Sequence, residues 1–406
     1  MATNDAAAAW ERITALASAP GACDLGQGWP DFGSNRTAVA AATRAMTAGD
    51  ARAHQYAPVR GRAECVRALV EYYAKTGYDV RRPVDGGGVD DGSSCVVVTA
   101  SATEALYGAF QGALRRTPGR DEIVFVEPFF PWYRAIADDL GGKSVVVRAE
   151  ASDGFAIDVD AVRAACDARK TALLVMCSPH NPTGHCATRA ELEGIAKIAE
   201  DLDLIVLSDE VYERAVFDDG GREHVRLATI GNMRERCVTL GSASKLLNVT
   251  GWRVGWAVGP KELIDPIKSA HSLMSYSAPT PLQIGVAAAL DEISATATGR
   301  VEADENAAVM RANAQTLGKA LEDVGMRVFY PQGGYFLTCD VSSTGLTDME
   351  FCELLAARAR VAAVPMSVFF LNAPDIPRSL VRFAICKIPE TCAESARRIR
   401  AHAPYD

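Results

Sequence analysis

The sequence lacks the patterns that mark metal-binding, membrane-spanning and nucleic-acid-binding proteins. Its six histidines form no HExxH motif and its eleven cysteines form no CxxC pair, so we expect no structural or catalytic metal. No apolar run approaches the roughly 20 residues that a membrane-spanning helix needs. Acidic residues outnumber basic ones by 51 to 42, and a net charge of −9 has the wrong sign for neutralising a phosphate backbone. We therefore expect neither a membrane nor a nucleic acid as partner.

The features of a secreted protein are missing as well. The opening MATNDAAAAW has no basic segment before an apolar core, so we expect no secretory signal. The eleven cysteines are odd in number and scattered, which in a chain of 406 residues is typical of reduced, mostly buried thiols. These features predict a cytoplasmic protein, and the chain is long enough for two domains.

Short apolar runs rich in β-branched residues recur between helical segments. They lie at 95–100, 122–126, 144–148, 172–176, 204–208, 237–241 and 255–259. Strands that alternate with helices indicate βαβ units and a mostly parallel sheet covered on both faces. We predict an α/β fold with a large domain at 46–295 built on a mostly parallel seven-stranded sheet, and a smaller α+β domain at 296–406. Residues 1–45 form an N-terminal arm and part of the small domain.

Ligands of such a sheet bind beyond the carboxyl ends of its strands, so the residues there are the first candidates for a site. Ser101 follows the first strand as the expected N-cap of a helix that opens at Ala102 and Thr103. Free N–H groups at a helix start bind phosphate readily, although an ordinary capped helix has the same pattern. Phe129 and Phe130 follow the next strand, where an aromatic ring can stack on a planar ligand or pack in the core.

Polar residues also end two later strands. Asn181 lies in the turn sequence after 172–176, and its amide can hydrogen-bond a phenolic oxygen. Asp209 ends an almost wholly apolar strand, with Tyr212 three residues later. A carboxylate at such depth requires a partner. That partner is either a salt bridge or helix cap of the protein, or the protonated ring nitrogen of a ligand.

A lysine among small residues and hydroxyls follows the strand at 237–241. The segment Ser242-x-x-Lys245 matches the SxxK motif of β-lactamase-type acyltransferases, but the SDN motif that accompanies it there is absent. A lysine at the end of a strand presents its amine inside a pocket. Lys245 as a Schiff-base amine, with Ser242 and Arg253 binding a phosphate, accounts for all three residues.

Taken together, these segments resemble the fold-type-I, pyridoxal-phosphate-dependent aminotransferases of class I/II, and most of all the kynurenine/glutamine aminotransferase group. The matching segments follow the family's order and cover nearly the whole chain: LGQGWPDF (25–32), QYAPVRGRAECVRAL (55–69), VTASATEAL, EPFFPWY, SPHNPTG, SDEVY, GSASKLLNVTGWRVGW, PQGGYF (331–336), VAAVPMSVFF (361–370) and VRFAICK (381–387). The resemblance implies that 46–295 is a domain binding pyridoxal 5′-phosphate. It also implies a ping-pong transfer of an amino group from an L-amino acid to a 2-oxo acid.

The resemblance implies a role for each residue near the cofactor ring. Lys245 carries the cofactor as a Schiff base and then acts as the general acid–base that moves the substrate's proton. Asp209 pairs with the pyridine nitrogen and keeps it protonated. Asn181 and Tyr212 hydrogen-bond the phenolic oxygen, and Phe130 stacks on the ring. Lys245, Asp209 and Tyr212 are therefore the expected catalytic residues.

The resemblance likewise implies which residues hold the cofactor phosphate. They are the N–H groups of Ala102 and Thr103, the hydroxyl of Ser242, the guanidinium of Arg253, and Tyr56 of a neighbouring subunit. A tyrosine supplied by a neighbour implies a homodimer with shared active sites. The segment 271–283 matches the family loosely, so the residue that completes the contact between subunits stays open.

The expected substrate-binding residues are Gly28, Trp29, Asn181 and Arg382. Arg382 matches the arginine that grips the substrate α-carboxylate as a bidentate fork. No second arginine for a dicarboxylate side chain is evident, and the expected pocket residues Trp29, Tyr133 and Phe369 are aromatic. We therefore expect an aromatic, sulfur-containing or glutamine-like donor. Trp29 equally fits a packed hinge residue between the arm and the small domain.

The chain departs from the family pattern in two places, and two functions other than transamination are considered. Ser101 stands where the family usually has glycine, and SPH replaces the common residues before Asn181-Pro182. A cysteine-conjugate β-lyase or a cyclising synthase uses the same site and cofactor. A non-catalytic, cofactor-binding regulator is disfavoured, because the set Lys245, Asp209, Tyr212 and Arg382 is complete and no DNA-binding helix-turn-helix segment is evident.

Overall fold

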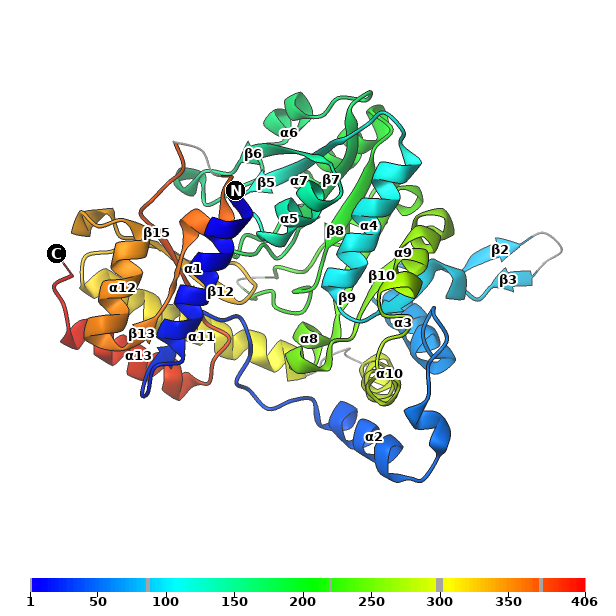
Figure 1. The fold of residues 1–406 in the computed structure, drawn as a ribbon, viewed down its shortest axis with the longest axis horizontal. Coiled ribbons are helices and arrows are strands. Elements are labelled where there is room, and N and C mark those ends of the chain that lie inside the picture. The colour runs from blue at the N-terminus through cyan, green and yellow to red at the C-terminus, as the bar shows by residue number, and fades with distance from the viewer. Residues whose placement is uncertain (1, 85–87, 219–220, 297–301, 372–374, 406) are drawn as a thin grey trace.

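A seven-stranded sheet forms the centre of the large domain in the computed structural model, which describes residues 2–84, 88–218, 221–296, 302–371 and 375–405 (Figure 1). Its strands are β4 (Val96–Thr99), β5 (Glu122–Glu127), β6 (Lys143–Arg148), β7 (Thr171–Cys177), β8 (Ile205–Asp209), β9 (Cys237–Ser242) and β10 (Gly255–Val258). Their order is β4-β10-β9-β8-β7-β5-β6, and only β10 runs antiparallel to its neighbours. The predicted α/β fold with a mostly parallel seven-stranded sheet is confirmed.

Helices cover both faces of this sheet, because its strands are apolar on both sides. One face is covered by α4 (Ala102–Arg116), α5 (Trp132–Asp139) and α9 (Lys261–Met274). The other is covered by α3 (Ala63–Lys75), α6 (Val159–Ala165), α7 (Arg189–Asp201), the short α8 (Ala243–Leu246) and α10 (Thr280–Ala295). β7 is buried along its whole length, as expected for a central strand between two helical layers.

The smaller domain is built on a four-stranded antiparallel sheet in the order β11-β12-β15-β14. Its elements are α11 (Glu302–Asp323), β11 (Arg327–Phe329), β12 (Phe336–Asp340), α12 (Asp348–Ala359), β13 (Val361–Ala362), β14 (Val364–Pro365), β15 (Leu380–Ala384) and α13 (Pro389–Ala401). Its core is a separate apolar cluster that includes Leu337, Phe351 and Phe383.

The N-terminal residues contact both domains. α1 (Ala2–Ala17) packs against α12 and β13 of the small domain, and β1 (Cys23–Asp24) pairs with β13. α2 (Arg36–Thr47) instead packs against α10 of the large domain. A two-stranded ribbon of β2 (Arg82–Val84) and β3 (Gly88–Asp90) projects from the large domain (Figure 1). The domain boundaries at 45/46 and 295/296 stay predictions.

The residues predicted to form the site lie together at one edge of the large sheet. β7, β8 and β9 are parallel neighbours that end at Cys177, Asp209 and Ser242. β10 begins at this same edge because it is antiparallel, and Gly255 pairs with both Thr99 and Ser242. The turn that follows β4 (99–102), the chain after β8 and the chain after β9 therefore meet here. Among the helices that the structure describes, none combines the length and the hydropathy that crossing a lipid bilayer requires.

Candidate active site

A pocket of about 220 Å³ opens at this edge of the sheet. The structure brings nine of the predicted site residues into its lining: Ala102, Thr103, Phe130, Asn181, Asp209, Tyr212, Ser242, Lys245 and Arg253. Gly28 and Arg382 contact this set through hydrogen bonds to Lys245 and Asn181 respectively. These eleven residues come from both domains and from the N-terminal segment, so the site lies where the three meet.

The amine of Lys245 is held in an aromatic and buried environment. Its Nζ donates a hydrogen bond to the carbonyl oxygen of Gly28 at 2.6 Å and lies 5.7 Å and 5.1 Å from the ring centres of Tyr212 and Tyr335. Burial, which penalises the ammonium form, lowers the pKa of Lys245 from 10.5 to about 8, and the charge of Arg382 acts in the same direction. A larger neutral fraction makes this amine a better nucleophile and base than a surface lysine.

Asp209 is a buried carboxylate whose hydrogen-bond partners among the described residues are neutral groups. The Tyr133 hydroxyl donates to its Oδ2 at 2.6 Å, and the Val211 amide donates to its Oδ1 at 3.3 Å. Burial raises the pKa of Asp209, against the effect of these hydrogen bonds and of the Lys245 charge. A buried carboxylate normally needs a cation, so Asp209 fits a ligand that brings a protonated ring nitrogen.

Tyr212 and Phe130 form aromatic walls of the pocket. Tyr212 is 6% exposed, and burial raises its pKa well above the usual value, so its hydroxyl is a neutral donor. The ring of Phe130 is stacked on that of Trp132, with 5.1 Å between ring centres, and Phe130 lines the pocket. These are the groups expected beside a planar ligand with a phenolic oxygen.

The start of α4 presents hydrogen-bond donors to one side of the pocket. Among the described residues, the N–H groups of Ala102 and Thr103 find no acceptor in the protein. The Ser244 hydroxyl, also in the lining, is buried without a hydrogen-bond partner. The hydroxyl of Ser242 and the guanidinium of Arg253 complete the side. Free helix N–H groups, a hydroxyl without a partner and a cation are the donor set that a phosphate group needs.

Arg382 lies on β15 between two aromatic rings. Its guanidinium carbon is 3.8 Å from the ring centre of Phe336 and 4.6 Å from that of Phe369. Nη1 donates to Asn181 Oδ1 at 2.9 Å, Nη2 donates to the Gly26 carbonyl at 3.1 Å, and Nε is buried without a partner. Burial lowers the pKa of Arg382 to about 9, so the group stays cationic at neutral pH. Arg382 is therefore a cation held in a fixed position, and its Nε remains available to donate a hydrogen bond.

Two predicted residues lie outside the pocket of their own chain. Tyr56 is 83% exposed, and its ring packs edge-on against that of Tyr276 with 5.5 Å between the ring centres. Trp29 is 45% exposed and lies under the ammonium group of Lys387, 3.7 Å from its ring centre. Lys387 also donates to the Trp29 carbonyl at 2.9 Å. This geometry favours the alternative prediction, in which Trp29 is a packed hinge residue between the arm and the small domain.

Several residues at the site escaped the sequence interpretation. Ser244 sits directly before Lys245, and that adjacency was the available signal. The Tyr335 hydroxyl donates to the Lys245 carbonyl at 3.0 Å. Trp10 lies with its ring centre 5.6 Å from the Arg382 guanidinium carbon, and its buried Nε1 has no partner. Nothing local predicts that contact, because Trp10 belongs to an alanine-rich helix far away in the sequence.

The KTG triplet that accompanies SxxK in acyltransferases does occur in this chain, as Lys75-Thr76-Gly77. It lies at the C-terminal end of α3 and is absent from the pocket lining around Lys245. The Thr76 hydroxyl donates to the carbonyl oxygens of Tyr72 and Tyr73, as expected at a helix end. The acyltransferase interpretation therefore fails on geometry.

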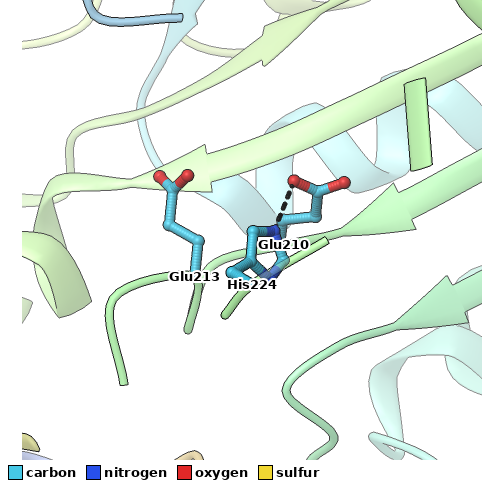
Figure 2. Close-up of side chains that lie close together, drawn as sticks. All are labelled: Glu210, Glu213 and His224. Carbon is cyan, nitrogen blue, oxygen red and sulfur yellow. Dashed lines mark hydrogen bonds and ion pairs between the residues drawn. The ribbon is translucent and has the colours of Figure 1, made fainter. Parts of the chain in front are cut away.

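An ionic cluster lies directly beside Asp209. Figure 2 shows Glu210, Glu213 and His224 close together, with His224 Nε2 2.9 Å from Glu210 Oε2. The buried Arg226 donates to Glu210 Oε2 at 2.6 Å and forms a second ion pair with Glu213. Arg226 thus occupies the position of a cation between the two carboxylates and offsets part of their charge.

The family that the fold and the pocket define is shown by comparison. The model of the aminotransferase class I and II family matches residues 21–399, and the chain belongs to this family. Its members use pyridoxal phosphate, and the donor set of the pocket fits that group. When bound, pyridoxal phosphate supplies an aldehyde that bonds to an amine and a protonated ring that accepts electrons. The protein is an aminotransferase, and amino acids and 2-oxo acids are its expected substrates.

Individual relatives are similar over almost the whole chain. The probable N-succinyldiaminopimelate aminotransferase DapC of Mycobacterium tuberculosis is 38% identical over 95% of this chain and 94% of its own. The methionine aminotransferase of Escherichia coli is 32% identical over 96% and 94%. Kynurenine–oxoglutarate transaminase 3 of the mouse is 30% identical over 97% and 87%.

Solved structures agree with this likeness. The N-succinyldiaminopimelate aminotransferase of M. tuberculosis superimposes with a TM-score of 0.86 at 37% identity, covering 97% of each chain. The Thermus thermophilus aspartate aminotransferase with maleate gives 0.82 at 27% identity, covering 98% of this chain and 96% of that one. The predicted fold-type-I architecture is confirmed.

Proposed function

We propose that this aminotransferase takes its amino group from a neutral L-amino acid, with an aromatic, sulfur-containing or glutamine-like side chain, and passes it to a 2-oxo acid by a ping-pong mechanism. One observation carries the substrate class. Arg382, the cation for the α-carboxylate, is enclosed by the rings of Trp10, Phe336 and Phe369. In the described pocket lining the cations are Lys245 and Arg253, and both have other tasks. Aromatic walls without a spare cation favour an uncharged side chain.

The geometry of each group supports the role that we propose for it. Arg382 binds and orients the substrate α-carboxylate beside Asn181. Lys245 takes the proton from the substrate Cα and returns it, which a buried amine with a pKa of about 8 can do near neutral pH. Asp209 keeps the cofactor ring nitrogen protonated. Tyr212 and Asn181 hold the phenolic oxygen and Phe130 supports the ring.

The phosphate side has a role of its own, which is anchoring. Ala102 and Thr103 donate through their N–H groups, Ser242 through its hydroxyl, and Arg253 neutralises charge. Gly28 belongs to the substrate side, since its carbonyl accepts the hydrogen bond of Lys245, and Trp29 adjoins it. Relatives in this family with printed activities are transaminases, which favours transfer over elimination or regulation.

A second donor has an observation in its favour. The relative with 38% identity is named as a probable N-succinyldiaminopimelate aminotransferase. Such a donor carries a carboxylate far from the reacting amine and would require a cation that the described pocket lining does not spare. We therefore place it second to a neutral donor.

The deciding experiment is a donor panel with one oxo acid in excess. We expect kcat/KM for methionine, glutamine, phenylalanine or kynurenine to exceed that for aspartate by at least about tenfold, the factor that corresponds to 1.4 kcal/mol of transition-state binding. N-succinyldiaminopimelate enters the same panel. A higher kcat/KM for it, or for aspartate, than for every neutral donor would overturn the substrate class and leave the aminotransferase assignment intact.

We further propose that the protein is a cytoplasmic homodimer in which Tyr56 serves the neighbouring active site. Tyr56 forms part of an exposed apolar patch with Leu273 at 84%, Met274 at 47% and Tyr276 at 50% exposure. A contiguous apolar patch of this kind usually marks a protein interface. The eleven cysteines form no disulfide, as expected of a reducing compartment.

A further inference from the structure

Tyr133 reaches the carboxylate of Asp209 from a different layer of the large domain. It lies on α5, 76 positions before Asp209, and its hydroxyl donates to Asp209 Oδ2 at 2.6 Å. The ring is 2% exposed and is fixed by the rings of Phe125, stacked at 6.1 Å, and Phe130, edge-on at 5.7 Å. The position of the hydroxyl is therefore set by packing on both sides of the ring.

The carboxylate that receives this hydrogen bond has little other support. Its Oδ1 accepts a long hydrogen bond of 3.3 Å from the Val211 amide. The charged and titratable groups that face Asp209 are Tyr133, Tyr212, Cys177, Glu210 and Lys245. Of these, only the Lys245 amine is a cation, and it is hydrogen-bonded to the Gly28 carbonyl.

These contacts set two opposing effects on the charge of Asp209. Burial and the neighbouring charge of Glu210 raise its pKa, whereas the hydrogen bond from Tyr133 lowers it. A donor that is held against the ionised form stabilises that form, and a hydrogen bond to a charged group is stronger than one between neutral groups. A phenylalanine would fill the same space without burying a polar atom, so the depth of the Tyr133 hydroxyl is explained by its polar partners, the Asp209 carboxylate and the Cys177 thiol.

We propose that Tyr133 is a positioning residue that keeps the carboxylate of Asp209 ionised and oriented into the pocket, ready to hold the protonated ring nitrogen of the cofactor. The inference rests on the proposed role of Asp209. Tyr133 thereby acts on the cofactor through Asp209, in addition to lining the pocket as expected from the sequence.

The test compares Tyr133→Phe with Tyr107→Phe in the full-length protein. Tyr107 is a matched control, because its hydroxyl donates to Asp139 Oδ2 at 2.9 Å on the surface of the same domain. The dissociation constant of pyridoxal phosphate from the apoprotein is measured between about pH 5.5 and 8.5. We expect Tyr133→Phe to bind the cofactor nearly as well as wild type at the alkaline end. The loss of cofactor affinity on acidification should begin about one pH unit higher in Tyr133→Phe than in the wild type. We call this low-pH part of the curve its acid limb. Tyr107→Phe should follow the wild-type curve.

An acid limb unmoved by Tyr133→Phe would overturn the proposal. So would an affinity reduced by the same factor at every pH, which is the mark of a packing defect. A double-mutant cycle remains decisive if Tyr133→Phe is destabilised: in an Asp209→Asn background, Tyr133→Phe should leave the cofactor affinity unchanged within about twofold. A full loss in that background would contradict action through Asp209. If Asp209→Asn alone kept wild-type affinity and activity, the role of Asp209 itself would be wrong.

Discussion

The amine of Lys245 shows how a buried position prepares a side chain for chemistry. Among the described residues its Nζ is held by one carbonyl, that of Gly28, and by the faces of two tyrosine rings. No carboxylate in the described part of the chain lies at hydrogen-bond distance to stabilise the ammonium form. The amine is therefore partly neutral near neutral pH, whereas an ordinary lysine is almost wholly charged.

The reactivity of this amine should depend on pH accordingly. Only the neutral amine attacks an aldehyde, and burial lowers the pKa of Lys245 to about 8, so the neutral form predominates above that pH. We expect the rate at which apoprotein captures pyridoxal phosphate to rise with pH and to level off above about pH 8. Stopped-flow absorption measures this rate, with Nα-acetyl-lysine as the control amine. A protein rate that keeps rising to pH 10 like that of the free amine would refute the lowered pKa.

Sequence motifs identified the residues of the site but not their contacts. Lys245, Asp209 and Asn181 were predictable because each ends or follows an apolar strand, which is a local pattern. The hydrogen bond between Tyr133 and Asp209 joins different layers of the domain. The contact of Trp10 with Arg382 joins opposite ends of the chain. Such contacts depend on the packing of whole elements, which no local pattern encodes.

The start of α4 stores backbone strain at the phosphate side. Ser101 has φ 143° and ψ 162°, a region that glycine adopts freely and other residues avoid at a cost of about 1–3 kcal/mol. Its side chain accepts the N–H of Glu104 at 3.2 Å as a helix cap. The hydroxyl of Ser101 therefore stabilises the helix start, whereas its Cβ makes the backbone conformation unfavourable. This strain agrees with the glycine that the family resemblance leads us to expect at this position.

Substitutions at Ser101 should separate the two effects. Ser101→Gly relieves the strain and gives up a cap that glycine replaces at a cost of a few tenths of a kcal/mol, so we expect the apoprotein to be stabilised by about 1 kcal/mol. Ser101→Ala keeps the strain and loses the cap, and should destabilise by about 1 kcal/mol. Urea unfolding of both variants gives the comparison. The strain argument is wrong if the glycine variant is the less stable of the two.

The junction of β10 with α4 leaves no room for a side chain at Gly255. A Cβ there would lie 2.2 Å from the Ala102 nitrogen and 2.4 Å from the Ser101 carbonyl carbon, both backbone atoms that cannot turn away. We expect Gly255→Ala to displace the phosphate turn and to weaken pyridoxal phosphate binding at least about tenfold, since overpacking costs about 1–3 kcal/mol. Gly251→Ala is the control in the same connection, where the added Cβ meets open space. Equal cofactor affinity in the two variants would contradict this account.

At the scale of elements, the positions of the strands were easier to predict than the direction of a strand or the structure of the N-terminal arm. The runs at 95–100 and 204–208 became β4 and β8 within one or two residues, because buried strands have a strong apolar signature. The antiparallel direction of β10 was not predictable, since a strand buried on both faces looks the same in either direction. The helix α1 was expected only as an arm.

At the scale of the whole molecule, our proposal is that two chains complete each site together. Tyr56 and its exposed apolar neighbours lie away from the pocket of their own chain, which supports a dimer with shared sites. The family resemblance predicted this arrangement. The structure of the single chain adds the observation that the patch is exposed.

Mixed dimers test the sharing directly. Subunits with Lys245→Ala and subunits with Tyr56→Phe are combined by co-expression and assayed at limiting cofactor. In each mixed dimer one site then has both wild-type residues, so about a quarter of all sites should regain activity. Combining Lys245→Ala with Arg382→Ala is the control, because both residues serve the pocket of one chain and no site is restored. Equal recovery in the two mixtures, or none in the first, would argue against shared sites.

The central claim, that this site exchanges an amino group through Lys245, is tested by a single half-reaction. The holoenzyme is mixed with methionine, glutamine, phenylalanine or kynurenine in the absence of any oxo acid, and absorption and products are followed together. We predict that the absorption band of the pyridoxal form disappears and that about one equivalent of the matching 2-oxo acid forms per active site. Lys245→Ala should lose at least about a hundredfold in rate, the lower end of what general acid–base catalysis contributes. A band that no amino acid converts, or conversion that is unaffected in Lys245→Ala, would contradict the account.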